Sequence, residues 1–339
     1  MRAGAAVFLS VRCLVSGLVP ALPPSALAQE NGVETVEVRA YPIAQFRVGS
    51  DETRFGIFEF VGGFEMRGSN DHFGGFSGLR FLDAGENFLG VSDSGFWYAG
   101  DIARDARGRP VGVGHFRMAP LLGADGLPVY GKADGDAESL AVAGDTAIVG
   151  FERNHRLEAY PIDTGNFASR PKALPLPVPA YELRNNRSFE TVAVAPADSP
   201  LAGATVTVTE KSLNPAGDVF AAVTDGPRKG IFYVRRSDEF DISDGDFLPD
   251  GDLLLLERRF SLASGIAFRL RRIPAEDIRP GATVEGEIVL GADMQHQIDN
   301  MEGLSVWQDA DGIPHISLIS DNNQSILQRT IYLEFRLGE

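Results

Sequence analysis

Acidic and basic side chains recur at matching places along the chain. Glu138, Glu190 and Glu302 each open a short apolar run. Carboxylate oxygens are ligands for hard cations such as Ca²⁺, and Arg and Lys side chains bind phosphate groups. The pattern therefore predicts a site that binds a cation, or an anion bridged by a cation. After a turn and a second apolar run, these three segments end in a polar or charged pair, namely Glu152-Arg153, Glu210-Lys211 and Ser320-Asp321. A fourth segment, which opens with Ser77, ends in Ser92-Asp93.

Hairpin pairing is expected to bring both ends of each unit together. A turn near Gly144 places Glu138 opposite Phe151 and beside Glu152, because residues of an antiparallel pair face each other across the turn. If each hairpin forms the inner part of one blade, its acids border a central channel. The predicted ring combines eight acids with three bases: Asp93, Glu138, Glu152, Glu190, Glu210, Glu257, Glu302 and Asp321, with Arg153, Lys211 and Arg258 between them.

Carboxylates crowded in one channel repel one another unless a cation or raised pKa values relieve the conflict. Calcium takes about six to eight oxygen ligands, which such a ring supplies. The alternative is that each acid pairs with a base in a structural network. Sequence neighbours such as Glu152 and Arg153 point to opposite faces of a strand and cannot simply pair. We predict five calcium ligands, which are Asp93, Glu138, Glu190, Glu302 and Asp321.

A channel cation can polarise an ester oxygen and lower the pKa of a bound water. Positive side chains near the leaving oxygens would orient a phosphate and stabilise its transition-state charge. Such a site needs no Ser-His pair. The predicted catalytic residues are Arg153, Lys211, Arg258, Glu152 and Glu210.

The elements that position these residues are predicted to be strands. Short apolar or alternating runs such as 87–92, 146–151, 205–209 and 315–320 are bounded by turn residues, and helical periodicity is almost nowhere sustained. A degenerate copy of the unit covers 247–258, so units start near 77, 138, 190, 247 and 302. Radial repetition of this kind predicts an all-β fold, a β-propeller.

Dividing the chain by the unit spacing predicts six blades, with five or seven as alternatives. A β-sandwich is the competing architecture, and it does not explain a recurring unit of this length. The strand-like runs 32–41 and 330–337 suggest that one terminus completes the blade begun by the other. The acidic segment Asp241 to Asp246 resembles a calcium loop in composition, but it lacks a terminal Glu at the required spacing and is expected to be an exposed turn.

The first 28 residues are predicted to be a secretory signal peptide. Arg2 precedes an apolar run, and Ala26-Leu27-Ala28 is a small-x-small cleavage site. An uncleaved anchor is the alternative, although Arg12 would be costly inside a membrane. We expect residues 29–339 to form one periplasmic or secreted domain, without a membrane span and as a monomer. The net charge of −16 argues against nucleic-acid binding, since phosphate neutralisation needs a basic surface.

Four motifs resemble those of a known family. They are Glu138-Ser139-Leu140-Ala141-Val142, Phe189-Glu190-Thr191-Val192-Ala193, Asn300-Met301-Glu302-Gly303-Leu304 and Ser320-Asp321-Asn322-Asn323. Together they are similar to the phytase-like β-propeller family, described as having esterase-like activity of phytase, from about residue 56 to 337. The resemblance implies hydrolysis of phosphomonoesters or related esters, a small-molecule substrate and, by analogy with calcium-dependent propeller phytases, calcium ions among the channel carboxylates.

Two other functional classes stay open. Lactonases of the gluconolactonase and paraoxonase type also use six blades and a channel calcium, and Glu302-Gly303 at the start of a strand is similar to their pattern. A non-catalytic propeller that presents its rim loops to a protein or glycan is the third class. Channel acids fully paired with side-chain bases would favour that binding module.

Overall fold

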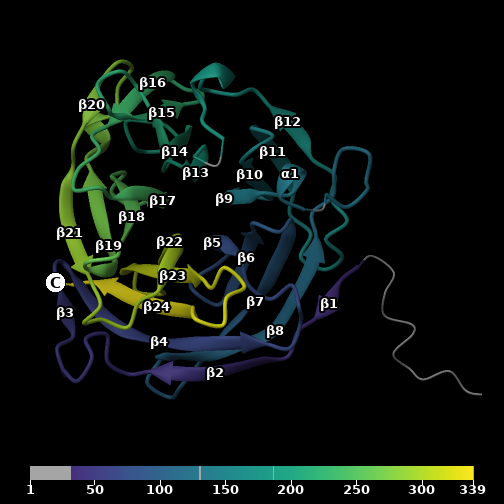
Figure 1. Cartoon of the computed structure of the whole chain (residues 1–339), viewed down its shortest axis with the longest axis vertical. Coiled ribbons are helices and arrows are strands. Elements are labelled where there is room, and N and C mark those ends of the chain that lie inside the picture. The colour runs from purple at the N-terminus through teal and green to yellow at the C-terminus, as the bar shows by residue number, and fades with distance from the viewer. Residues whose placement is uncertain (1–31, 130, 186, 339) are drawn as a thin grey trace, which may run out of the picture.

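The computed structural model describes residues 32–129, 131–185 and 187–338. They form five antiparallel-rich sheets arranged around a central axis, with the first strand of each sheet nearest the axis (Figure 1). The prediction of an all-β propeller is confirmed. The expected six blades are corrected to five, because the strands before residue 70 add to existing sheets and form no blade of their own. The predicted signal peptide lies outside the described residues.

The first four strands of blades one to three follow the chain outward from the axis, and a short fifth strand from elsewhere in the chain is added to blades one and three. Blade one runs β5 (Phe76–Phe81), β6 (Asn87–Ser92), β7 (Phe96–Arg104), β8 (Pro110–Pro120) and β1 (Glu34–Thr35). Blade two runs β9 (Ala137–Ala143), β10 (Thr146–Phe151), β11 (Arg156–Pro161) and β12 (Lys172–Leu174). Blade three runs β13 (Phe189–Val194), β14 (Thr205–Leu213), β15 (Val219–Val223), β16 (Gly230–Val234) and β20 (Thr283–Val284).

Blade five is built from both ends of the chain. Its strand β24 (Thr330–Leu337) lies between β23 (Pro314–Asp321) and β4 (Phe58–Gly68), so the C-terminal run pairs with N-terminal residues, as the sequence predicted. Blade four runs β17 (Asp241–Phe247), β18 (Leu253–Ser261), β19 (Gly265–Ile273) and β21 (Glu287–Ala292). Blade five runs β22 (Asn300–Gln308), β23 (Pro314–Asp321), β24 (Thr330–Leu337), β4 (Phe58–Gly68) and β2 (Val38–Ile43), with β3 (Arg54–Phe55) paired to β4.

Apolar side chains fill the spaces between neighbouring blades. Strand β18 shows why the sequence suits this packing, because side chains along a strand alternate between its two faces. Leu253 and Leu255 belong to the core shared with blade three, whereas Leu254 and Leu256 belong to the core shared with blade five. A continuous leucine run is therefore the expected signature of a blade strand that is buried on both faces.

An arginine closes the channel at depth. The Arg80 guanidinium on β5 binds Asp244 on β17 at 2.9 and 3.0 Å and donates to the carbonyl oxygens of Val192 and Leu304. Four blades therefore meet at one buried side chain. This corrects the expectation for residues 241–246, which form the innermost strand of blade four with Asp244 fully buried.

Short helices connect some of the strands, and they are α1 (Gly131–Asp134), η2 (Ala180–Glu182) and η3 (Ala275–Asp277). None of the helices seen in the described residues has the length and apolar composition that crossing a membrane requires.

Candidate functional site

A β-bulge recurs at the same place in every innermost strand. The residue register shifts by one between each inner strand and its neighbour. A bulge redirects the side chain that it leaves unpaired. It also corrects the predicted hairpin register, because Phe151 faces Ala137 and leaves Glu138 in the bulge. The bulged residues are Ser77, Glu138, Glu190, Ser243 and Glu302.

All of these bulged residues except Ser243 line a cavity of about 190 Å³ at one mouth of the channel. Its lining contains eight carboxyl groups against three cationic side chains, so negative charge is in excess. The structure thus places nearly all of the sequence-predicted site residues around one space. The lining residues are Ser77, Asp93, Lys132, Asp136, Glu138, Glu152, Arg153, Glu190, Glu210, Arg258, Glu302, Asp321 and Asn323.

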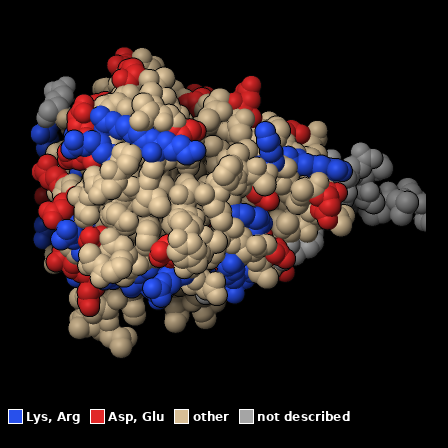
Figure 2. Space-filling view, turned by 90° about the horizontal axis from the view of Figure 1, so that it is seen from above, with Lys and Arg blue, Asp and Glu red and all other residues tan. Residues whose placement is uncertain are grey.

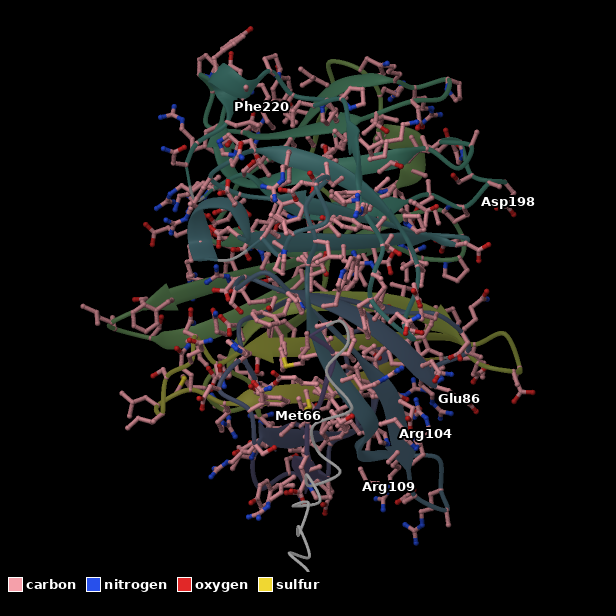
Figure 3. All side chains as sticks on the ribbon, turned by 90° about the vertical axis from the view of Figure 1, so that its right-hand side faces the viewer. Met66, Glu86, Arg104, Arg109, Asp198 and Phe220 are labelled. Atoms are coloured by element: carbon pink, nitrogen blue, oxygen red, sulfur yellow. The ribbon has the colours of Figure 1, made fainter. Side chains whose placement is uncertain are left out.

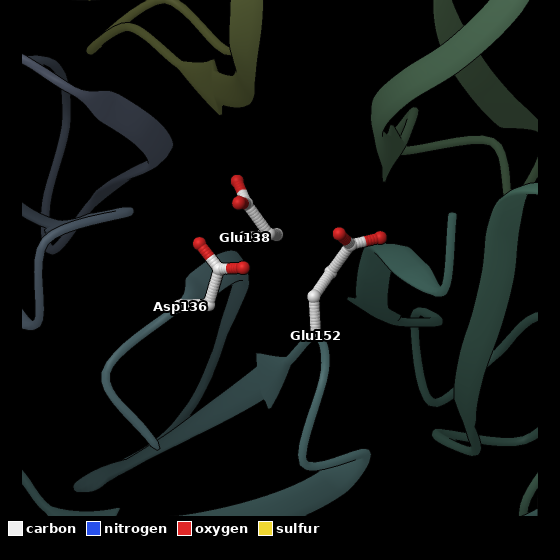
Figure 4. Close-up of side chains that lie close together, drawn as sticks. All are labelled: Asp136, Glu138 and Glu152. Atoms are coloured by element: carbon white, nitrogen blue, oxygen red, sulfur yellow. The ribbon is translucent and has the colours of Figure 1, made fainter. Parts of the chain in front are cut away.

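Three of the carboxyl groups converge at blade two. Asp136, Glu138 and Glu152 each offer an oxygen within 4.8 Å of the other two (Figure 4). Asp136 was not among the predicted residues, although its position two residues before Glu138 was a usable signal. Its side chain is buried, and one carboxylate oxygen, Oδ1, has no hydrogen-bond partner among the described residues.

The cationic side chains of the cavity pair with some of the acids. Lys132, which sequence reasoning also missed, lies 2.6 Å from Asp93, and Arg153 Nε lies 2.8 Å from Asp136. On the other side, Arg258 lies 3.1 Å from a Glu302 oxygen, and it lies 3.6 Å from a Glu210 oxygen. No base pairs with its sequence neighbour. Three cations cannot neutralise eight acids, so a fully paired network does not account for the cavity.

Two bulge carboxylates, those of Glu138 and Glu190, are left without a cation. Across residues 32–129, 131–185 and 187–338, neither forms an ion pair within 4.0 Å or a side-chain hydrogen bond with a donor. Burial raises the pKa of both carboxyls well above the usual value, and the surrounding acids raise it further. The negative charge of the site is therefore least compensated at Glu138 and Glu190.

Other acids of the ring show the same conflict. Burial raises the pKa of Glu152 to about 7 and that of Glu302 to about 8, and neighbouring carboxylates add to both shifts. Burial also raises the pKa of Asp321 to about 6. The donors are all oxygen atoms, and their shared charge is negative. The residues present thus fit a hard cation such as calcium, which would replace protons as the neutralising species.

Two predicted positions lie elsewhere. Lys211 pairs with Asp241 at 2.8 Å and lines a neighbouring hollow outside the channel cavity. Glu257 is buried inside blade four, where Arg269 and Arg271 bind its carboxylate. The predicted ring assumed that the acid at the end of every inner hairpin points toward the channel. The strand at 253–261 continues past the ring position, so Glu257 points into the sheet and Arg258 reaches the channel.

A channel cavity lined by polar and charged side chains from all five blades, with carboxylates from blades one, two, three and five and Arg258 from blade four, defines the protein as a β-propeller with an axial polar site. The family follows from the sequence. The chain belongs to the phytase-like family, described as "Esterase-like activity of phytase", whose sequence profile matches residues 71–324. The resemblance drawn from the repeated motifs is therefore confirmed. No protein of curated function has a sequence that matches the chain.

Solved structures with a similar fold have very different sequences. The PQQ-bound aldose sugar dehydrogenase of Streptomyces coelicolor is 11% identical, with a TM-score of 0.43 over 88% of this chain and 98% of that chain. A protein of unknown function from Dyadobacter fermentans DSM 18053 is 13% identical, with a TM-score of 0.43 over 90% and 99%. Glutaminyl cyclase of Myxococcus xanthus is 12% identical, with a TM-score of 0.42 over 78% and 92%.

Proposed function

We propose that the protein is an exported, calcium-dependent hydrolase of phosphomonoesters or related esters, acting at the channel mouth on small-molecule substrates. Family membership supports ester hydrolysis. The observation that carries the metal dependence is the group of Asp136, Glu138 and Glu152, whose oxygens lie within 4.8 Å of one another. Asp136 Oδ1 accepts no hydrogen bond among the described residues, and its nearest cation is Lys132 Nζ at 4.0 Å. Export to the periplasm or the medium follows from the predicted signal peptide.

The chain would hold the ion with carboxylates of blades two and three. Asp136, Glu138 and Glu152 form the nearest set, and Glu190 is the next carboxylate without a cationic partner. Glu302, Asp93 and Asp321 complete the predicted ligands, although bases already neutralise the first two in part. When bound, calcium supplies a Lewis acid that polarises an ester oxygen and lowers the pKa of a water.

The bases of the cavity are suited to bind the substrate. Lys132, Arg153 and Arg258 surround the carboxylates, and each already forms a charge-assisted contact that fixes its position. A phosphate entering the mouth would exchange part of these contacts for its own oxygens, which a planar guanidinium binds with two N–H groups. Glu210 lies among these groups outside the ion-binding set and is placed to hold or release a proton during hydrolysis. Glu152, the other acid predicted to be catalytic, would act through the ion that it helps to hold.

The test is hydrolysis by the purified protein of a panel of phosphomonoesters and lactones, with calcium or with a chelator, together with calorimetric titration of calcium. Calcium-dependent release of phosphate supports the proposal. Hydrolysis of lactones alone would instead assign the lactonase class, and calcium binding without either activity would assign a binding module. Failure of calcium to bind would refute the metal site.

A further inference from the structure

Apolar side chains are exposed on three neighbouring loops of blades four and five. Leu262, Ile326 and Leu327 are 88% to fully exposed, and Phe260 and Met294 are 70% and 62% exposed. Met294 lies against Gly265 at the tip of the β18–β19 hairpin. We call these five residues the apolar tips. Exposed apolar residues are common singly, but a group on adjacent loops marks an interaction surface.

The apolar tips lie on the side of the propeller where the channel cavity opens. Arg258 on β18 and Asp321 at the end of β23 both line that cavity, and the chain continues from them into the tips. The β18–β19 hairpin and the loop after β23 project beyond the blades on the left of Figure 3. Figure 2 shows uncharged residues projecting from its lower edge, which is the same side. A flat surface approaching this face would meet the tips first.

Charged residues of both signs lie at the base of each projection. Beside the hairpin, a hollow of about 350 Å³ contains Lys211, Arg236 and Arg259 together with Glu239 and Asp241. The Nε group of Arg259 is buried and has no hydrogen-bond partner among the described residues.

The second hollow lies under the loop after β23. It measures about 440 Å³ and contains Arg67 and Arg329 together with Glu65 and Asp71. Mixed charge around apolar side chains complements a headgroup layer that carries both phosphate and ammonium. The net charge of the chain, −16, opposes a purely anionic surface.

We propose that the apolar tips insert into the interface of a zwitterionic phospholipid bilayer, while the charged residues at their bases contact the headgroups. Insertion of a few apolar side chains to interfacial depth needs no membrane span. Docking in this orientation turns the channel mouth toward the lipid surface. The proposal does not depend on the hydrolase function, because lipid binding is measured without turnover.

A polarity-sensitive fluorophore tests the tips directly. The chain contains one cysteine, Cys13, so the probe is attached to Leu262→Cys or Ile326→Cys in a Cys13→Ser background. Phosphatidylcholine vesicles should shift the emission of both probes to the blue. The matched control is Leu127→Cys, which is 64% exposed on a loop of another blade and should not respond.

Vesicle sedimentation supplies the second measurement. We expect two double variants to lose at least about tenfold in affinity for phosphatidylcholine vesicles. They are Phe260→Ser with Leu262→Ser, and Ile326→Ser with Leu327→Ser. Their thermal unfolding should match the wild type, because the changed side chains are exposed. Replacing part of the phosphatidylcholine by phosphatidylglycerol should weaken binding.

Three results would overturn the proposal. The first is a silent probe at both tip positions in the presence of phosphatidylcholine vesicles. The second is a blue shift that depends on protein concentration without lipid, which would make a second copy of the chain the occupant. The third is binding that requires phosphatidylglycerol, since the surface recognised would then be anionic.

Discussion

Replacing Glu138 by Gln should stabilise the metal-free protein and weaken calcium binding, two effects of opposite sign from one substitution. In the unfolded chain the pKa of this carboxyl is close to 4.5, and burial beside Asp136 and Glu152 raises it well above that in the fold. At pH 7 the metal-free fold must therefore take up a proton there or tolerate the repulsion. Gln has a similar shape and carries no charge.

The size of the effect follows from proton linkage. Keeping this carboxyl protonated at pH 7, which is 2.5 pH units above its unfolded pKa of 4.5, costs at most about 3.5 kcal/mol, at about 1.4 kcal/mol per unit. Because Glu138 is not completely buried, solvent reduces this, and we expect a gain of about 1–3 kcal/mol for Glu138→Gln at pH 7. Near pH 4 the carboxyl is protonated in both states, so the gain should vanish.

Urea unfolding in chelator and in calcium measures both effects. Saturation at one hundred times the dissociation constant stabilises the wild type by about 2.7 kcal/mol. Glu138→Gln should lose most of that gain because it lacks one ligand. Glu37→Gln, at an exposed acid outside the cavity, is the control and should behave as the wild type. Two results would refute the charge-conflict reasoning. One is a Glu138→Gln protein that is less stable than the wild type in chelator at pH 7. The other is a Glu138→Gln protein whose free energy of unfolding rises with calcium as much as that of the wild type.

Three other predictions concern the channel. Without metal, the free energy of unfolding should fall from pH 4.5 toward pH 8, because the raised pKa of Glu302, about 8, makes the folded state bind more protons in that range. The melting temperature should depend less on pH when calcium is added. Arg80→Ala should cost about 3–5 kcal/mol in urea unfolding because Asp244 is left buried and unpaired, whereas the exposed Arg67→Ala should change stability by less than about 0.5 kcal/mol. Arg153→Ala should lower phosphoester turnover more than Lys211→Ala, since only Arg153 lines the cavity; equal losses in steady-state assays would contradict this placement.

The sequence was most informative where one pattern repeats. Four of the recurring units correspond to the two inner strands of a blade, and the acids at their ends reach one cavity because equivalent positions in a propeller meet at the axis. The degenerate unit at 247–258 was placed one strand late, because the innermost strand of blade four is Asp241–Phe247. The blade count was overestimated because length was divided by unit spacing, although residues 34–68 add outer strands to blades one and five.

Contacts between blades were beyond sequence reasoning. Arg80 sits in a strand without any unusual local pattern, and its partner Asp244 lies in a run that is typical of surface turns. Only the ring closure brings them within 2.9 Å. Lys132 was missed for the same reason, since it reaches Asp93 from the short helix α1, which precedes the first strand of the next blade.

The mixed origin of blade five has a consequence for how the chain assembles. Strand β4 ends at residue 68, and its partner β24 begins only at residue 330. The pairing of β4 with β24 therefore spans most of the chain and can form only after the rest of the propeller. Closing such a long loop costs entropy and makes ring closure a slow step. Until it occurs, β4 and β23 present unpaired edges to other molecules. A chain cut before Thr330 would keep four whole blades but would leave the edges of β4 and β23 exposed. We expect such a chain to aggregate, and not merely to lose structure locally in blade five.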